Sequence, residues 1–291
     1  MKTLREYIAD AEARKKCIGH FNIANIEGLW AVWEAAQAAS AEAGELIPVI
    51  IGTSEGERNH FGIQQVVNLV QDLREDNQYP IFINADHSYS VETATTAIDA
   101  GYDMVIIDLA EKSYEENLAA TKKVVDYRNQ NNQHTLIEAE LGYIGGGSNI
   151  KDEVPEGVSE ESMTDPLEAK QFVAETGLDL LAPSVGNVHG MVTSGHPALH
   201  PEHISMVRHQ AGIPLVLHGG SGSSDDDFRK AIAAGISIIH ISTELRVAYR
   251  TALEKSLVEN ESLSPYKYLK PAQKAMQDAV LGRIRLFWGL E

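Results

Sequence analysis

The chain has 291 residues with 43% hydrophobic side chains, which suffices for one large α/β barrel or two ordinary domains. Its formal net charge of −18 argues against nucleic acid and anionic membranes as partners, because both are polyanions. A single cysteine, Cys17, the lack of a signal-peptide core after Met1 and the lack of an apolar run of about 18 residues predict a soluble cytoplasmic protein.

Short apolar runs of strand-forming residues recur about every 30 residues, separated by segments with helical periodicity. The eight expected strands are 18–23, 48–53, 81–86, 104–109, 135–141, 180–185, 214–218 and 236–242. Unbroken apolar runs are typical of strands buried on both faces, and their alternation with helices favours parallel βαβ units. Eight units predict a closed (β/α)8 TIM barrel, as a single domain over residues 1–291. A doubly wound open sheet is the alternative.

Two further segments are expected around this barrel. Residues 142–164 are irregular and contain the run Gly145-Gly146-Gly147-Ser148-Asn149, and a loop of this length predicts a mobile flap after the fifth strand. Residues 265–291 are amphipathic and predict a C-terminal helical extension. Gly101 and Gly235 are expected to end helices just before strands, and Asp165-Pro166 to begin one.

Polar residues collect at the carboxyl ends of the expected strands, the face where barrels carry their active sites. In strand order they are Asp86 and His87, Asp108, Glu138 and Glu140, His189, His218 with Gly219 to Gly222, and Ser242 with Thr243. Neighbouring residues of a strand face opposite sides. We therefore expect the third strand to end between Asp86 and His87, so that the backbone turns and both reach one site.

Three histidines from three different strands lie on this face: His87, His189 and His218. Three neutral imidazoles that leave a fourth position open are typical of a catalytic zinc site. A single histidine at such a place is more often a satisfied polar residue than a ligand, so the hypothesis depends on the three together. Seven others are expected to be structural or surface residues: His20, His60, His134, His196, His200, His203 and His209.

The loop after the seventh strand and the start of the following helix suit an anion. Gly219, Gly220 and Gly222 allow close backbone approach, and Ser242-Thr243 opens a helix whose N-terminus favours negative charge. Barrels commonly hold a phosphate between the last two loops. The predicted substrate is a phosphorylated small molecule, which amides and hydroxyls bind despite the acidic net charge.

Seven short stretches, in order along the chain, resemble the signature sequences of class II, metal-dependent ketose-bisphosphate aldolases. They are Phe21-Asn22, Asn84-Ala85-Asp86-His87, Ile107-Asp108-Leu109, Glu138-Ala139-Glu140-Leu141-Gly142 with Gly145-Gly146, Gly186-Asn187-Val188-His189-Gly190, His218-Gly219-Gly220-Ser221-Gly222 and Ile241-Ser242-Thr243-Glu244. The resemblance implies a barrel that reversibly cleaves a ketose 1,6-bisphosphate, such as fructose or tagatose bisphosphate. The products are dihydroxyacetone phosphate and glyceraldehyde 3-phosphate.

The resemblance also implies roles for individual residues. Catalytic Zn²⁺ would bind His87, His189 and His218. Asp86 would move the proton of the substrate's C4 hydroxyl, while Asp108 and Glu140 match positions that can hold a second or displaced metal. The positions that match the dihydroxyacetone phosphate site are Gly190, Gly219, Gly220, Ser221, His240, Ile241, Ser242 and Thr243. Ser54 is a candidate for the distal phosphate. A monovalent cation and a homodimer or homotetramer are also implied.

The sequence departs from the family pattern at two places. The eighth strand usually carries lysine and, two residues later, an asparagine that contacts the enediolate, but here Ile238 and His240 stand there. His240 could replace that hydrogen bond, add a metal ligand or abolish activity. The flap usually carries acidic residues after its glycines, whereas Gly147-Ser148-Asn149 leaves Asp152 or Glu153 as substitutes.

Two other functions therefore stand beside zinc-dependent aldol cleavage. One is a different metal-dependent C–C lyase or isomerase that acts on a phosphosugar. The other is a non-catalytic aldolase homologue that binds sugar phosphate or serves in an assembly. Asp86 argues against the latter, because a binding protein needs no proton-transfer residue.

Overall fold

Eight parallel strands close into a barrel in the order β1-β10-β9-β7-β5-β4-β3-β2. The computed structural model describes residues 1–147, 149–193 and 197–290, so Ser148 and His196 of the sequence analysis lie outside the described residues. The strands are β1 (Ile18–Asn22), β2 (Val49–Thr53), β3 (Ile81–Ser88), β4 (Met104–Ile107), β5 (Leu136–Leu141), β7 (Leu180–Pro183), β9 (Leu215–Leu217) and β10 (Ile236–Ile241). This closure confirms the predicted TIM barrel and excludes the open sheet.

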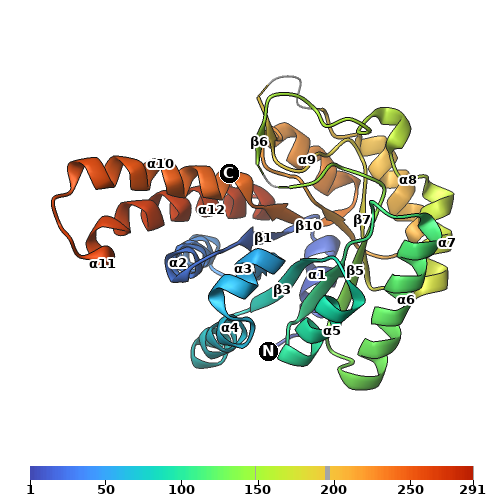
Figure 1. The fold of residues 1–291 in the computed structure, drawn as a ribbon, viewed down its shortest axis with the longest axis horizontal. Helices are drawn as coiled ribbons and strands as arrows, with labels where there is room; N and C mark the ends of the chain where they lie inside the picture. The colour runs from blue at the N-terminus through green and yellow to red at the C-terminus, as the bar shows by residue number, and fades with distance from the viewer. Residues whose placement is uncertain (148, 194–196, 291) are drawn as a thin grey trace.

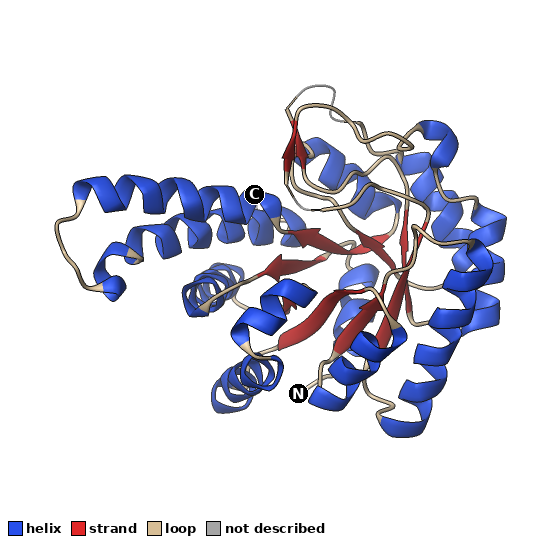
Figure 2. Ribbon diagram, viewed as in Figure 1, coloured by secondary structure: helices blue, strands red, loops and turns tan. Residues whose placement is uncertain are grey.

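Helices surround the barrel and connect its strands (Figure 1; Figure 2). They are α1 (Leu4–Ala13), α2 (Ile26–Ala43), α3 (Glu55–Phe61), α4 (Ile63–Asn77), α5 (Val91–Ala100), α6 (Tyr114–Asn131), α7 (Pro166–Thr176), α8 (Pro201–Ala211), α9 (Asp225–Ala234), α10 (Thr243–Glu259), α11 (Pro265–Tyr268) and α12 (Lys270–Trp288), with a 3-10 turn at Glu160–Ser162. All residues of the barrel strands are buried, because side chains fill the barrel and helices cover its outer face.

The predicted helix boundaries have local chemical causes. Asp165 caps α7, since its Oδ1 accepts hydrogen bonds from the amides of Leu167 (2.8 Å) and Glu168 (2.9 Å). Pro166 occupies the first helical position, where its missing N–H has no cost. Gly235 follows α9 with a φ of 119°, a conformation that favours glycine.

The expected flap, residues 142–164, contains more regular structure than the sequence indicates. Its short strand β6 (Ile150–Lys151) pairs in parallel with β8 (Met191–Val192), and Figure 1 shows β6 outside the barrel. The Nζ of Lys151 also donates a hydrogen bond to the carbonyl of His189 at 2.7 Å. These contacts tie the flap to the segment that carries His189.

The C-terminal tail is helical, as predicted. α10 and α12 pack against each other and extend away from the barrel as a hairpin, while α12 also packs on α2 and β1 (Figure 1). Trp288 at the end of α12 is buried, and its Nε1 donates to Glu45 Oε1 at 3.0 Å. Within the described ranges, no helix is both long enough and apolar enough to span a membrane.

Candidate active site and metal centre

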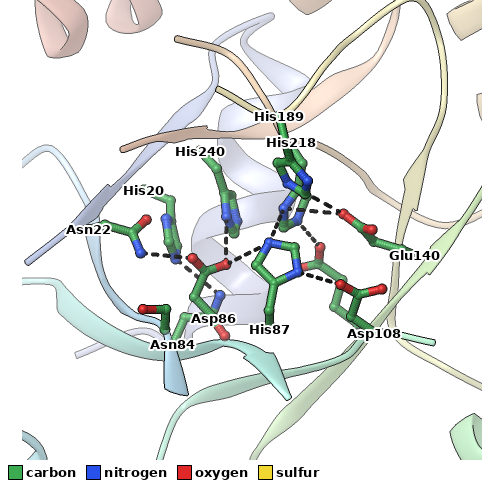
Figure 3. A network of polar contacts seen from close by, with 12 residues as sticks. His20, Asn22, Asn84, Asp86, His87, Asp108, Glu140, His189, His218 and His240 are labelled. Carbon is green, nitrogen blue, oxygen red and sulfur yellow. Dashed lines mark hydrogen bonds and ion pairs between the residues drawn. The ribbon is translucent and has the colours of Figure 1, made fainter. Parts of the chain in front are cut away.

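Asp86 and His87 reach the same site through a bulge in β3. The expectation that the strand ends between them is wrong, because β3 continues to Ser88 while its pairing with β4 shifts register between Ala85 and Ser88. His87 has a φ of 49°, so the backbone turns within the strand. As a result, both side chains lie in one polar network (Figure 3).

A buried arginine holds this bulge in place. The guanidinium of Arg58 on α3 donates hydrogen bonds to the carbonyls of Thr53 (3.1 Å) and Asp86 (3.2 Å). It also donates to the hydroxyl of Ser88 at 2.9 Å. The side chain of Arg58 is buried, and burial lowers its pKa.

Three imidazoles and one carboxylate converge beside Asp86. The four residues are buried, and one ligand atom of each lies within 4.8 Å of the others: His87, Glu140, His189 and His218. His87 Nε2 and His218 Nδ1 are 3.2 Å apart. Two nitrogens that bind one tetrahedral Zn²⁺ at about 2.0–2.1 Å lie about 3.3–3.4 Å from each other, so this spacing fits a shared metal.

Each of the three histidines has its other ring nitrogen next to a hydrogen-bond acceptor. The pairs are His87 Nδ1 with Asp108 Oδ2 (2.8 Å), His189 Nδ1 with the carbonyl of Gly145 (2.8 Å) and His218 Nε2 with Glu138 Oε1 (2.7 Å). An acceptor at that place keeps the proton on the outer nitrogen, so the inner nitrogen presents its lone pair to the cluster. The two inner nitrogens of His87 and His218, 3.2 Å apart, therefore need a cation between them, either a shared proton or a metal ion. This donor set fits a metal ion.

Glu140 is placed to be a fourth ligand. Its Oε1 lies 3.5 Å from His218 Nδ1 and 3.8 Å from His189 Nε2, and no described residue donates a hydrogen bond to it. The family resemblance implies that Asp108 and Glu140 can hold a second or displaced metal, which stays a prediction. In this structure Asp108 orients His87, and among the described residues the cluster of ligand atoms does not include it.

Burial and neighbouring carboxylates set the charges of the cluster. Burial lowers the pKa of His189 and that of His218 to about 3, so both rings are neutral near pH 7. Burial also lowers the pKa of His87, but the carboxylates of Asp86 and Asp108 outweigh burial and raise this pKa to about 10. Binding of a divalent ion at His87 is therefore coupled to the release of a proton.

Asp86 is held by a hydrogen bond at one of its two oxygens. Its Oδ2 accepts a hydrogen bond from Asn22 Nδ2 at 2.8 Å. Its Oδ1 lies 3.7 Å from His87 Nε2 and 3.3 Å from His240 Nδ1, and it accepts no hydrogen bond of good geometry from the described residues. Burial raises the pKa of Asp86, but His87 and His240 outweigh burial and hold it well below its usual range. Asp86 is therefore ionised near pH 7, and its Oδ1 remains available to a substrate hydroxyl.

The glycine loop after β9 and the N-terminus of α10 form a small polar cavity. The hydroxyl of Ser221 accepts hydrogen bonds from the amides of Ser242 and Glu244, both at 3.3 Å. A Cβ at Gly219 would lie 2.2 Å from the carbonyl of Val188, so only glycine allows this approach. The cavity is lined by Asn22, Asp86 and the three histidines, and by the predicted Gly190, Gly219, Gly220, Ser221, His240, Ser242 and Thr243.

The side chain of Ile241 does not join this set. Neighbouring residues of a strand point to opposite sides, so Ile241 packs in the apolar core while His240 faces the cavity. Only the backbone of Ile241 is left to reach a ligand, and its role in substrate binding stays a prediction.

A second cavity of about 670 Å³ adjoins the first, and both are lined by Asp86, His87 and His189. Ser54 lines it as expected, although its hydroxyl also caps α3 by accepting a hydrogen bond from the amide of Glu57 at 3.4 Å.

The same cavity is lined by Arg246, a cation to which the sequence analysis assigns no role. Its guanidinium pairs with Glu57 Oε1 at 2.6 Å, and Glu57 Oε2 accepts a hydrogen bond from Asn22 at 3.0 Å. Since Asn22 also donates to Asp86, a chain of contacts joins Arg246 to Asp86. Arg246 lies three residues after Thr243 on α10, so the two share one face of the helix. This spacing from a predicted site residue is the sequence feature that indicates Arg246.

The flap contributes backbone and apolar surface to this cavity. Its contributors are Tyr143, Ile144 and the three glycines 145–147. Asp152 and Glu153, the expected acidic substitutes, do not line it. The carboxylates that do so come from other segments: Glu55, Asp86, Asp108, Glu111 and Glu140.

A parallel barrel with three imidazoles and a carboxylate at the carboxyl ends of its strands defines a metal-dependent barrel enzyme. The sequence matches the family described as "Fructose-bisphosphate aldolase class-II" over residues 2–289. The chain belongs to this family, which confirms the resemblance seen in its motifs.

Individual relatives agree with this assignment. The chain is 37% identical to the fructose-bisphosphate aldolase of Staphylococcus aureus (strain Mu50 / ATCC 700699) over 289 residues, which are 98% of this chain and 96% of the relative. It is 38% identical, with the same coverage, to the fructose-bisphosphate aldolase of Geobacillus stearothermophilus. Among solved structures, the YdjI aldolase from Escherichia coli K12 matches with a TM-score of 0.82 and 31% identity over 98% of this chain and 96% of that one.

Proposed function

We propose that the protein is a zinc-dependent aldolase that reversibly cleaves a ketose 1,6-bisphosphate, with fructose and tagatose bisphosphate as the leading substrates. The observation that carries the proposal is the position of Asp86. Its Oδ1 lies 3.7 Å from the His87 nitrogen that faces the metal-binding cluster. A base and a Lewis-acid site therefore meet at one point, as C–C cleavage next to a ketone requires.

In the proposed reaction, His87, His189 and His218 hold the metal, with Glu140 at a fourth or displaced position. When bound, Zn²⁺ supplies Lewis-acid stabilisation of the negative charge that cleavage leaves on the ketone half of the substrate. Asp86 accepts the proton of the C4 hydroxyl as the C3–C4 bond breaks and C4 becomes an aldehyde. In the reverse direction, Asp86 returns that proton to the new alcohol.

The two cavities suit the two phosphates of such a substrate. The glycine loop and the amide end of α10 would bind the phosphate of the dihydroxyacetone half, with Ser221 as a hydroxyl donor. Arg246 would bind the distal phosphate together with Ser54, because its guanidinium is a cation that lines the larger cavity. An acidic protein can bind a dianion in this way.

A second candidate is aldol cleavage of a different phosphorylated sugar. It is favoured by His240, which stands where the family usually has asparagine, and by the position of Asp152 and Glu153 outside the cavity lining. Both differences alter the surroundings of the substrate and leave the metal cluster intact.

A coupled assay of triose phosphate release from fructose and tagatose bisphosphate, with and without a chelator, tests the proposal. We expect cleavage of at least one bisphosphate, loss of activity with chelator and recovery with Zn²⁺. Zinc binding without turnover on either sugar would favour the second candidate. Chelator-resistant cleavage would contradict the metal mechanism.

We also propose a homodimer or homotetramer in the cytoplasm. The tip of the α10–α12 hairpin exposes apolar side chains that a second copy could cover: Leu257 (56% exposed), Val258 (87%), Leu263 (95%) and Tyr266 (73%). Light scattering on the purified chain gives the oligomeric state directly. A monovalent cation as a further cofactor stays a prediction.

A further inference from the structure

A second pair of histidines lies beside the metal-binding cluster (Figure 3). His20 on β1 and His240 on β10 are partners in the parallel register of these strands. Their rings stack with centroids 3.4 Å apart and an interplanar angle of 4°. On its other face, His240 packs against His218, with ring centroids 4.0 Å apart. The ring of His240 is therefore clamped between His20 and a proposed metal ligand (Figure 3).

The burial of the polar side chain of His20 is unfavourable for the stability of the fold. The side chain is fully buried, and its Nδ1 has no hydrogen-bond partner among the described residues. Its Nε2 contacts Asn84 Nδ2 at 3.1 Å. A buried polar atom without a partner destabilises the fold, and barrel interiors are dominated by branched apolar residues. An apolar side chain would fill this place at a lower cost.

The neighbouring strands β2 and β3 leave room for the ring of His20 and contact its edge. Residue 52 on β2 is glycine, and a Cβ there would lie 2.1 Å from His20 Cε1. Asn84 on β3 contacts the ring at its edge. The stack is therefore supported by residues from two further strands.

A second metal site is one reading of this pair, since ligand atoms of His20, Asp86 and His240 lie within 4.8 Å of one another. The stacking argues against it. A metal binds an imidazole nitrogen along a lone pair in the plane of the ring, at about 2.0–2.1 Å. In two parallel planes 3.4 Å apart, these directions do not converge on one point.

We infer that His20 is a positioning residue that fixes the ring of His240 against Asp86 and toward the substrate cavity. His240 Nδ1 lies 3.3 Å from Asp86 Oδ1, and His240 lines the cavity of the glycine loop, whereas His20 lines neither cavity. His20 therefore touches no substrate in either cavity, and its ring reaches the site through the stack on His240. The inference rests on the proposed function for its kinetic consequence, while the position of the ring can be tested without it.

The test is a double-mutant cycle on the zinc-loaded protein, with His20→Leu made in the natural chain and in the His240→Asn background. Leucine keeps the apolar volume and removes the flat ring. In the natural chain, His20→Leu should lower kcat by about 10- to 100-fold, because small misplacements at a reacting centre have effects of this size. KM, zinc content and the melting temperature should not fall. In the His240→Asn background, the same substitution should leave kcat unchanged.

Equal fold losses in both backgrounds would overturn the inference, as would full activity of His20→Leu or a second zinc ion lost on substitution. His209→Gln, at an exposed position on α8, is the control for loss of a histidine. If His20→Leu does not fold, His20→Gln takes its place in the cycle. The crystal structure of the folded variant should show the His240 ring displaced from Asp86, and an unmoved ring would also overturn the inference. This last result is independent of whether the natural chain cleaves either bisphosphate.

Discussion

Replacing Glu138 by glutamine should weaken zinc binding about tenfold, although Glu138 is not a proposed ligand. Its Oε1 lies 2.7 Å from His218 Nε2, and the side chain is fully buried. A hydrogen bond to a charged group contributes about 1.5–3 kcal/mol and a neutral one about 0.5–1.5 kcal/mol. Burial raises the pKa of Glu138 well above its usual range, whereas a metal bound at His218 favours the ionised carboxylate. In the zinc-loaded protein, glutamine therefore keeps the acceptor and loses the charge, so the difference is about 1–1.5 kcal/mol, or about tenfold in affinity. Glu138→Leu removes the acceptor and should cost up to about 100-fold.

The affinities are measured by competition with a chromophoric zinc chelator, on proteins whose folding is checked by thermal melting. Glu34→Gln, at an exposed position on α2, is the matched control and should bind zinc like the natural chain. Unchanged affinity in both Glu138 variants would show that His218 needs no outer partner. The argument that an acceptor at the outer ring nitrogen strengthens metal binding by the inner nitrogen would then fail for this site.

Three further predictions concern the base, the phosphate site and a surface ion pair. Asp86→Ala should leave zinc content near normal and lower kcat by about 10²- to 10⁴-fold, and full activity would remove Asp86 from its proposed role. Ser221→Ala should weaken dihydroxyacetone phosphate binding about tenfold, measured by calorimetry, because a hydrogen bond to a charged group is lost. Arg14 holds the pKa of Glu45 at about 2, below its ordinary 4.5, and a depressed carboxyl pKa stabilises the fold above the unfolded value. The melting temperature of Glu45→Gln should therefore lie below that of the natural chain at pH 7. This gap should narrow as the pH falls from about 4.5 toward about 2, and a constant gap would contradict the assignment.

Much of the barrel could be predicted because its signals are local. Each strand is rich in apolar, strand-forming residues, and helix ends carry their own signals, such as Asp165 at the start of α7 and Gly235 at the end of α9. The three proposed metal ligands were found because barrels gather polar residues at the carboxyl ends of their strands. To apply this rule, one must know where a residue lies along its strand, but not which distant segments are in contact.

The remaining parts of the site depend on contacts that no local pattern encodes. His20 meets His240 only because the closed barrel places β1 beside β10. Asp86 and His87 share a site through a bulge inside β3, and the sequence gives no sign that the strand continues beyond them. The role of Glu138 follows from which ring nitrogen of His218 faces the cluster, a matter of side-chain orientation. The short strands β6 and β8 pair although they lie in two different loops, one after β5 and one after β7.

Anomalous diffraction at the zinc edge from zinc-loaded crystals tests the central claim most directly. The account predicts one strong peak per chain, at about 2.0–2.1 Å from the inner nitrogens of His87, His189 and His218, with Asp86 beside it and not bound to it. A peak centred between His20 and His240, or rings of the three proposed ligands turned away from a common ion, would contradict the account.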